Sequence, residues 1–281
     1  MDYINFRLKE ISNDINTIFP GWINGDERVA VFAPHDDDAL IGAGYAIEAA
    51  ISNGGEVFAV IFCNGDCGYS TPGDKTVIVE KRRKETLNAH ELFGIPKENN
   101  IYMGYPDFSA WQYFGYHLVN GAEGATIEII KFIREHKITR VLIPNGYREH
   151  LDHESVFRMG AYDVIQAGDA VVTDISEPYL IRNILQYSVW ADFSPEDALV
   201  SGAGDIRANR AILVPKQVED KIYKALLEFK SQIDIIHILM ERRKERITKM
   251  GYMELYIQYD PRPKLDFAPY KKLVDGEELK Y

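Results

Sequence analysis

The sequence predicts an α/β protein, a Rossmann-like three-layer sandwich in which helices cover both faces of a mostly parallel sheet. Three observations predict this fold. Apolar runs at residues 29–33 and 57–63 have the length and β-branched content of buried strands. A helical pattern lies between them, and such a βαβ unit makes its two strands parallel. Proline, which cannot donate to a sheet ladder, ends two strands at Pro34 and Pro144.

The first half of the chain alternates strands with helices. Residues 1–20 carry apolar side chains at helical spacing and predict an amphipathic helix. The remaining predictions are strands at 29–33, 57–63, 101–103 and 140–144 and helices at 40–52, 81–93 and 126–136.

The second half is less regular. Residues 184–190 and 211–214 predict strands with antiparallel potential, and residues 217–249 predict one long helix. A proline-rich tail beyond Gly251 predicts an extended segment that wraps the body. We expect a single domain over 1–281, with a core at about 28–250 on which the N-terminal helix 1–20 and the tail 251–281 pack.

The amino-acid composition limits the classes of protein and of partner that are compatible with this chain. The 281 residues include 46% hydrophobic and 27% charged residues, as in ordinary globular proteins. A net charge of -11 disfavours nucleic acid as a partner, since phosphates would be repelled. No apolar run is long enough to span a bilayer, and the N-terminus lacks the features of a signal peptide. Two cysteines, Cys63 and Cys67, are too few for a disulfide framework, so we expect a cytoplasmic location.

A cluster of polar residues follows the first apolar strand directly: His35, Asp36, Asp37 and Asp38. Like charges side by side repel, and burying them without a cation is costly. The cluster therefore predicts a metal site. The structural alternative is a solvated acidic turn that caps the next helix.

A second cluster, His150, Asp152 and His153, follows the strand that Pro144 ends. Ligands of open parallel sheets bind outside the carboxyl ends of strands, so the two clusters are expected to converge. Two histidines and one carboxylate would leave open positions for water and substrate, as in a catalytic zinc site. As an alternative, His150 caps a helix or lies on the surface.

The stretches PHDDDALIGAG and HLDH resemble the two motifs of the PIG-L/LmbE family of metal-dependent N-deacetylases, A/P-H-P-D-D-E and H-x-D-H. The resemblance extends to the RRKE helix at 82–94, the GYPD loop at 104–107 and the pair Ser231-Gln232. It covers about residues 28–235 and implies an LmbE-like fold.

The resemblance also implies roles for eight residues. The metal ligands would be His35, Asp38 and His153. In catalysis, Asp37 would be the base, His150 would act at the carbonyl or the leaving amine, and Asp152 would orient a histidine. Arg82 and Asp107 would bind the substrate. The expected cofactor is Zn²⁺ or another divalent metal such as Fe²⁺. The expected reaction removes an N-acetyl group from a small-molecule amino sugar or an N-acetylglucosamine conjugate.

Two departures from the family pattern keep alternatives open. Asp36 replaces the family's proline, and Ala39 replaces its glutamate. An amidase acting on another small-molecule conjugate is one alternative. A catalytically impaired carbohydrate-binding relic is the other. The sequence leaves open the aglycone, the acyl group, the physiological metal and whether the chain forms a homo-oligomer.

Overall fold

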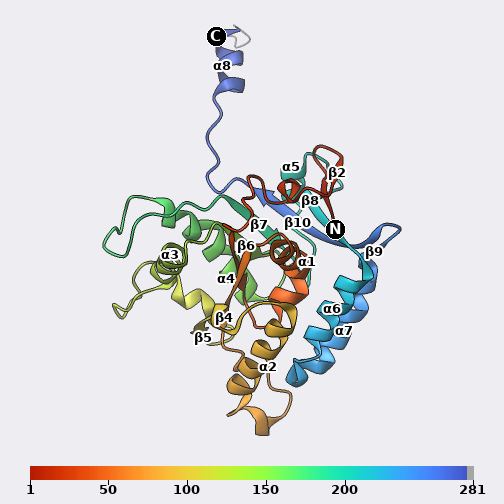
Figure 1. Ribbon diagram of the computed structural model, residues 1–281. Coiled ribbons are helices and arrows are strands. Elements are labelled where there is room, and N and C mark those ends of the chain that lie inside the picture. Colours follow the sequence, from red (N-terminus) through yellow and green to blue (C-terminus); the bar gives the residue numbers. More distant parts are fainter. Residues whose placement is uncertain (277–281) are drawn as a thin grey trace.

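The computed structural model describes residues 1–276, and its strands form one sheet in the order β2-β1-β8-β10-β7-β6-β3-β4-β5, with β9 paired to β10 (Figure 1). The strands are β1 (Asp2–Asn5), β2 (Glu10–Ser12), β3 (Arg28–Ala33), β4 (Glu56–Cys63), β5 (Asn100–Tyr105), β6 (Arg140–Pro144), β7 (Asn183–Tyr187), β8 (Arg210–Val214), β9 (Ile247–Thr248) and β10 (Gly251–Tyr259). The α-helices are α1 (Asp38–Ser52), α2 (Ile78–Phe93), α3 (Ala125–His136), α4 (Leu151–Arg158), α5 (Asp197–Ser201), α6 (Lys216–Leu226), α7 (Ile233–Arg243) and α8 (Ala268–Asp275).

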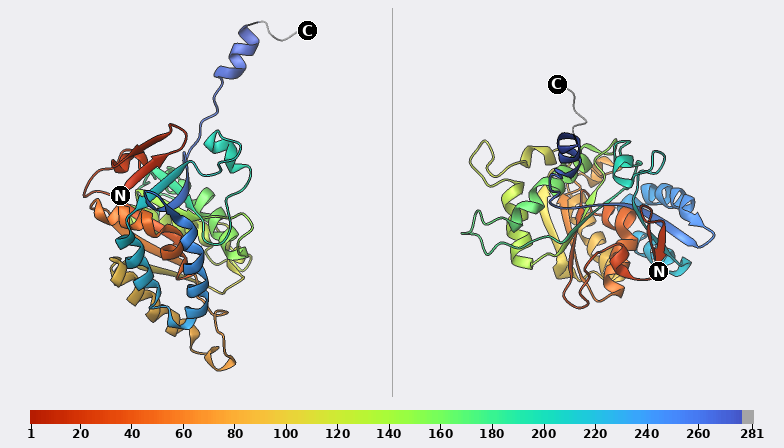
Figure 2. Two further views of the ribbon diagram at one scale, coloured as in Figure 1. Left: turned by 90° about the vertical axis from the view of Figure 1, so that its right-hand side faces the viewer. Right: turned by 90° about the horizontal axis from the view of Figure 1, so that it is seen from above.

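Helices cover both faces of the sheet, as predicted (Figure 2). Successive side chains of β3 point to opposite faces. Val29 and Val31 join a core with α1, α2, α6 and α7, whereas Ala30 and Phe32 join a second core with α3 and α4. Because both faces are buried, β3 is continuously apolar from Val29 to Ala33 rather than alternating.

The sheet is mixed, so the prediction of a mostly parallel sheet is wrong for half of it. The neighbours β7, β6, β3, β4 and β5 run parallel, and β10, β8, β1, β2 and β9 pair antiparallel. The antiparallel potential of the later strands is confirmed where β10 pairs with β7 and with β8.

The predicted N-terminal helix at 1–20 is wrong. The chain forms β1, β2 and a 3-10 turn at Ile15–Thr17 instead. Leu8 and Ile11, which the helical pattern would bury, are 69% and 52% exposed. Backbone pairing of β1 with β8 outweighs the weak preference of this short segment for a helix.

The predicted single helix at 217–249 is also wrong, because the chain breaks after α6 and restarts as α7. Phe229 at the break is fully buried. Glu85 of α2 accepts hydrogen bonds from the backbone and the hydroxyl of Ser231, and Gln232 donates to the carbonyl of Gly68 at 2.6 Å. The break therefore brings this segment to the loop that follows β4.

The segment beyond Gly251 does not wrap the body. Its first part is β10, an interior strand, and the described residues from Arg262 onward are exposed and lead to α8, which stands away from the sheet (Figure 2). The rest of the predicted tail, residues 277–281, lies outside the described residues. Within residues 1–276, no helix is long and apolar enough to cross a membrane.

Candidate active site

The two polar clusters meet at one edge of the sheet. β3 and β6 are parallel neighbours, and the chain leaves both at their carboxyl ends. The first cluster leads into α1, whose N-terminal cap is Asp37, and the second leads into α4, whose cap is His150. α1 packs closely because it is rich in small residues: a Cβ atom on Gly42 would lie 2.5 Å from the ring of Tyr187.

His35, Asp38 and His153 converge, with potential ligand atoms all within 4.8 Å of one another. Oδ2 of Asp38 lies 3.2 Å from Nδ1 of His35 and 3.1 Å from Nε2 of His153. That Nε2 atom is buried and has no hydrogen-bond partner within the described chain. Two imidazole nitrogens and one carboxylate oxygen are donors that Zn²⁺ and Fe²⁺ accept, so these residues fit such an ion.

The electrostatics of this cluster favour positive charge. Burial opposes charge on His35, yet Asp152 and Asp38 raise the pKa of His35 to about 10. Burial also opposes charge on His153, and Asp38 raises its pKa to about 9. Either protons or a divalent cation can supply the positive charge that the carboxylates demand.

Asp37 differs from its neighbour Asp38. Burial, reinforced by Asp38 and Asp36, raises the pKa of Asp37 to about 7. For Asp38, the histidines outweigh burial and lower the pKa. The carboxylate of Asp37 makes no hydrogen bond to any described residue, and Nη2 of Arg82 lies 3.8 Å from it. Of the three aspartates, Asp37 is thus the one whose carboxylate has no hydrogen-bond partner among the described residues.

A cavity of about 260 Å³ opens onto the cluster. It is lined by His35, Asp37, Asp38, Cys67, Gly68, Arg82, Asp107, Phe108, His150, His153, Trp190, Gln232 and Ile235. Phe108 has a φ of 61°, a left-handed conformation that is uncommon for a bulky residue. Asp152 holds it there by accepting the Phe108 N–H at 2.7 Å.

Residues 30–162 match the family model described as PIG-L, GlcNAc-PI de-N-acetylase. These residues form a PIG-L family domain. The matched residues contain both polar clusters, and the match ends before Ser231. A comparison with curated proteins gave no match.

Solved structures share the fold across most of the chain. The conserved protein TT1542 from Thermus thermophilus is 21% identical, with a TM-score of 0.62 over 85% of this chain and 98% of its own. N,N'-diacetylchitobiose deacetylase from Pyrococcus horikoshii is 19% identical, with a TM-score of 0.62 over 84% of each chain. GalB, the 4-carboxy-2-hydroxymuconate hydratase from Pseudomonas putida KT2440, is 16% identical, with a TM-score of 0.63 over 86% of this chain and 100% of its own.

Within the PIG-L domain, Asp152 lies next to His35, the histidine of the first cluster. Its carboxylate is fully buried, lies 3.5 Å from Nε2 of His35 and also accepts the backbone N–H of Ala110 at 3.3 Å. His150 accepts the backbone N–H of Asp152 and sets its ring 4.3 Å from that of Phe108. Burial lowers the pKa of His150, as does the nearby His35. His150 therefore caps α4, as the alternative predicted, and it also lines the cavity.

Both predicted substrate-binding residues of the PIG-L domain line the cavity but have partners within the protein. Arg82 is 5% exposed and forms an ion pair with Asp36. Asp107 accepts the backbone N–H of Gly65 at 2.8 Å and that of Cys67 at 3.0 Å. Contact with a substrate stays a prediction for both.

Sequence reasoning missed one buried residue of the PIG-L domain. Oε2 of Glu149 lies 2.7 Å from Nδ1 of His153. The signal that could have found it is the spacing of four to His153, which predicts neighbouring side chains on a helix, although Glu149 itself lies just before α4.

Proposed function

We propose that this protein is a divalent-metal-dependent hydrolase that removes an acetyl group from the nitrogen of an amino sugar or an amino-sugar conjugate. The observation that carries the proposal is the convergence of His35, Asp38 and His153 beside the free carboxylate of Asp37. The PIG-L family domain supports this reaction class. Phe108 and Trp190 at the cavity offer aromatic faces on which a sugar ring can stack.

The residues divide the work of amide hydrolysis. A divalent cation held by His35, Asp38 and His153 would polarise the acyl carbonyl and lower the pKa of water from ~15.7 toward ~7. Asp37 accepts a proton from the water whose oxygen bonds to the carbonyl carbon. His150 donates a hydrogen bond to the carbonyl oxygen as negative charge develops there. When the C–N bond breaks, the nitrogen takes up the proton from Asp37, and the free amine leaves together with acetic acid, which loses its proton to solvent as acetate.

The two free thiols support our proposal of a cytoplasmic location, where thiols stay reduced. Zn²⁺ and Fe²⁺ are both compatible with the donor set. We further propose that the chain acts as a single domain on a small-molecule substrate.

Metal analysis and product analysis test the proposed function. The purified protein should contain about one divalent metal ion per chain and release acetate with a free amine from a panel of N-acetylglucosamine derivatives. His35→Ala should abolish both, whereas His237→Ala, on the exposed face of α7, should abolish neither.

Other outcomes would replace the proposal. A protein without bound metal, or retention of metal by His35→Ala, would contradict it. Release of a different amine would indicate an amidase for another conjugate. Metal and sugar binding without turnover would indicate a carbohydrate-binding relic. Water addition to a carbon–carbon double bond would place the protein with the hydratase that shares its fold.

A further inference from the structure

The carboxylate of Glu149 lies between the metal-ligand cluster and the loop that follows β7. Its side chain is fully buried. Oε2 lies 2.7 Å from Nδ1 of His153, on the opposite side of the ring from the Nε2 atom that faces Asp38. A carboxylate at that position fixes the ring and its tautomer, leaving Nε2 free to bind a metal ion.

The other oxygen of Glu149 binds the loop. Oε1 accepts hydrogen bonds from the hydroxyl of Ser188 at 3.0 Å and from the backbone N–H groups of Val189, Trp190 and Ala191 at 3.1, 3.2 and 3.2 Å. Three consecutive backbone donors that converge on one oxygen form a cradle for an anion. The conformation of residues 188–191 therefore depends on this carboxylate.

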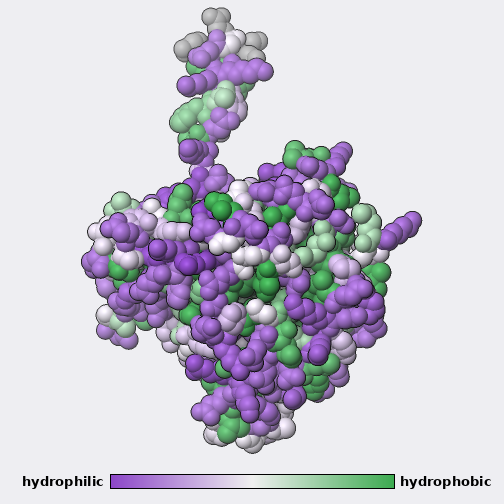
Figure 3. Space-filling view, viewed as in Figure 1, coloured by the Kyte–Doolittle hydropathy of each residue, from purple (hydrophilic) through white to green (hydrophobic). Residues whose placement is uncertain are grey.

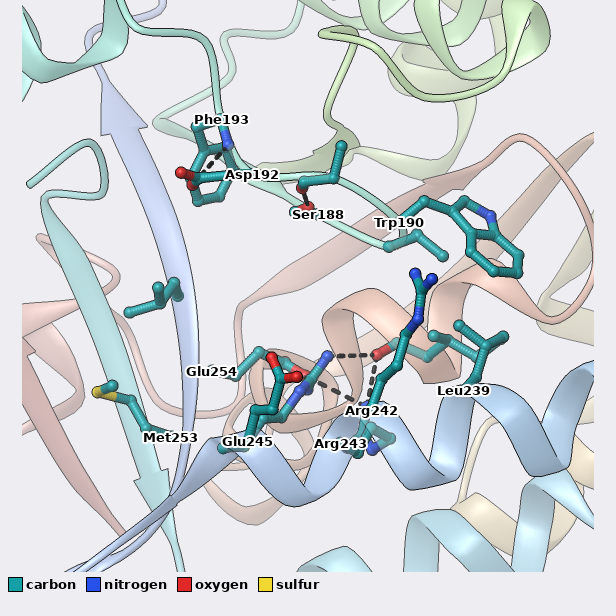
Figure 4. Close-up of a pocket in the computed structure, with 15 residues that line it drawn as sticks. Ser188, Trp190, Asp192, Phe193, Leu239, Arg242, Arg243, Glu245, Met253 and Glu254 are labelled. Carbon is teal, nitrogen blue, oxygen red and sulfur yellow. Dashed lines mark hydrogen bonds and ion pairs between the residues drawn. The ribbon is translucent and has the colours of Figure 1, made fainter.

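The loop is a wall of the space that a substrate would enter. Trp190 lines the cavity at the metal-ligand cluster and also a second cavity of about 540 Å³. Figure 4 shows this second cavity, with Ser188 and Trp190 on one side and Arg242 of α7 pointing toward them. The guanidinium carbon of Arg242 lies 5.9 Å from the centre of the Trp190 ring. The position of Trp190 thus sets the boundary between the two cavities.

We infer that Glu149 is a positioning residue that ties the substrate-facing loop 188–191 to the metal ligand His153. For the His153 end, the inference rests on the proposed function. A carboxylate suits this place because both of its oxygens accept hydrogen bonds. An amide has one acceptor and one donor group, so Gln at position 149 could satisfy either the loop or Nδ1–H of His153, but not both.

The decisive comparison is Glu149→Gln against Glu154→Gln. Glu154 lies on α4, pairs with Arg158 at the surface and provides the matched control. Loss of an outer carboxylate partner typically lowers metal affinity by roughly 10- to 100-fold. We expect a Zn²⁺ affinity lowered by that factor in Glu149→Gln and unchanged in Glu154→Gln, measured by competition with a chromogenic chelator.

The loop end has its own measurement. In a Trp22→Phe/Trp111→Phe background, Trp190 is the sole tryptophan. Acrylamide should quench it more strongly after Glu149→Gln. Ser188→Ala removes one loop donor only, so it should raise quenching slightly and leave Zn²⁺ affinity unchanged.

The outcomes separate the inference from the proposed function. Wild-type protein that binds no Zn²⁺ would contradict the proposed function. Wild-type Zn²⁺ affinity and wild-type quenching in Glu149→Gln would overturn the inference, even if its melting temperature falls. Should that variant not fold, long-range ¹H–¹⁵N spectra of the Zn²⁺-loaded wild type decide: a proton on Nδ1 of His153 is expected, and an unprotonated Nδ1 overturns the inference.

Discussion

The guanidinium of Arg82 on α2 donates from Nε to both carboxylate oxygens of Asp36, at 3.1 and 3.0 Å. Thr86, one turn further along α2, donates its hydroxyl to the same carboxylate at 3.2 Å. Asp36 is the residue that departs from the family's proline. The charge of Asp36 is neutralised by Arg82 of α2, so Asp36 is engaged within the protein and the next two aspartates face the cluster.

This ion pair predicts a large loss of stability for Arg82→Gln. The substitution leaves a buried carboxylate without its cation, and such losses cost about 3–5 kcal/mol. Urea unfolding should show that decrease, with recovery of most of it in Asp36→Asn/Arg82→Gln. Arg83→Gln, on the same helix over the Tyr102 ring, is the control. Equal stability of the two single variants would contradict the prediction.

Substitutions of Asp37 and Asp38 should differ in their effect on the amount of bound metal. Asp37→Asn keeps the three proposed ligands, so bound metal should stay near wild type while turnover falls by roughly 10²- to 10⁴-fold, as is typical when a general base is lost. Asp38→Asn should lose the metal as well. Metal analysis beside acetate release makes the comparison, and an Asp37→Asn protein without metal would show that Asp37 is a ligand.

Substitution of Asp107 should lower the stability of the fold more than the affinity for substrate. The carboxylate of Asp107 is the acceptor for the backbone N–H groups of Gly65 and Cys67. Leaving a buried donor unpaired costs about 1–3 kcal/mol, so Asp107→Ala should lower the free energy of unfolding by at least that much. A raised KM with unchanged stability would instead support the predicted contact with the sugar.

Asp163, in the turn after α4, gives the protein a pH-dependent stability. Burial raises the pKa of Asp163 to about 6, above the value of 3.8 in the unfolded chain, and a hydrogen bond from Thr126 opposes this. The folded state therefore takes up the proton first as pH falls, and stability rises between pH 6 and pH 3.8. Asp163→Asn should raise the melting temperature at pH 8 and leave it nearly unchanged near pH 4. Asp205→Asn, an exposed control, should show no such difference.

The projecting C-terminal segment should contribute little to folding. Its apolar residues are exposed, among them Phe267 at 58%, and hydrophobic patches are visible on its surface in Figure 3. Deletion of residues 263–281 should change the free energy of unfolding by less than about 0.5 kcal/mol, the usual range for surface changes. A larger loss, measured by urea unfolding, would show that α8 packs against a partner in solution.

The local pattern of the sequence was sufficient for the centre of the fold and for the convergence of the two polar clusters. An apolar run such as residues 29–33 of β3 indicates a buried strand. A proline followed by adjacent like charges indicates where such a strand ends. Parallel neighbours then bring His35 and His153 to one edge, because their strands end on the same side. The helices α1, α2 and α3 follow from the same alternation of strand and helix.

The outer half of the sheet could not be predicted in this way. Residues 1–20 carry a helical pattern, yet hydrogen bonds to β8, some 200 residues away, make part of them a strand. β10 enters between β7 and β8 for the same reason. Strand pairing is a contact between distant segments, and no local window of sequence contains both partners.

The same distinction holds within the site. The sequence by itself determined the proposed reacting groups, because His35, Asp37, Asp38 and His153 stand in two short motifs whose donors suit a divalent cation. Only the tertiary structure decided what supports them: Arg82 neutralises Asp36 across 46 residues, and Glu149 joins a histidine to the loop at Trp190, 41 residues further on. These partners meet because buried charges and backbone groups must be satisfied, and folding alone determines which side chains come near enough to do so.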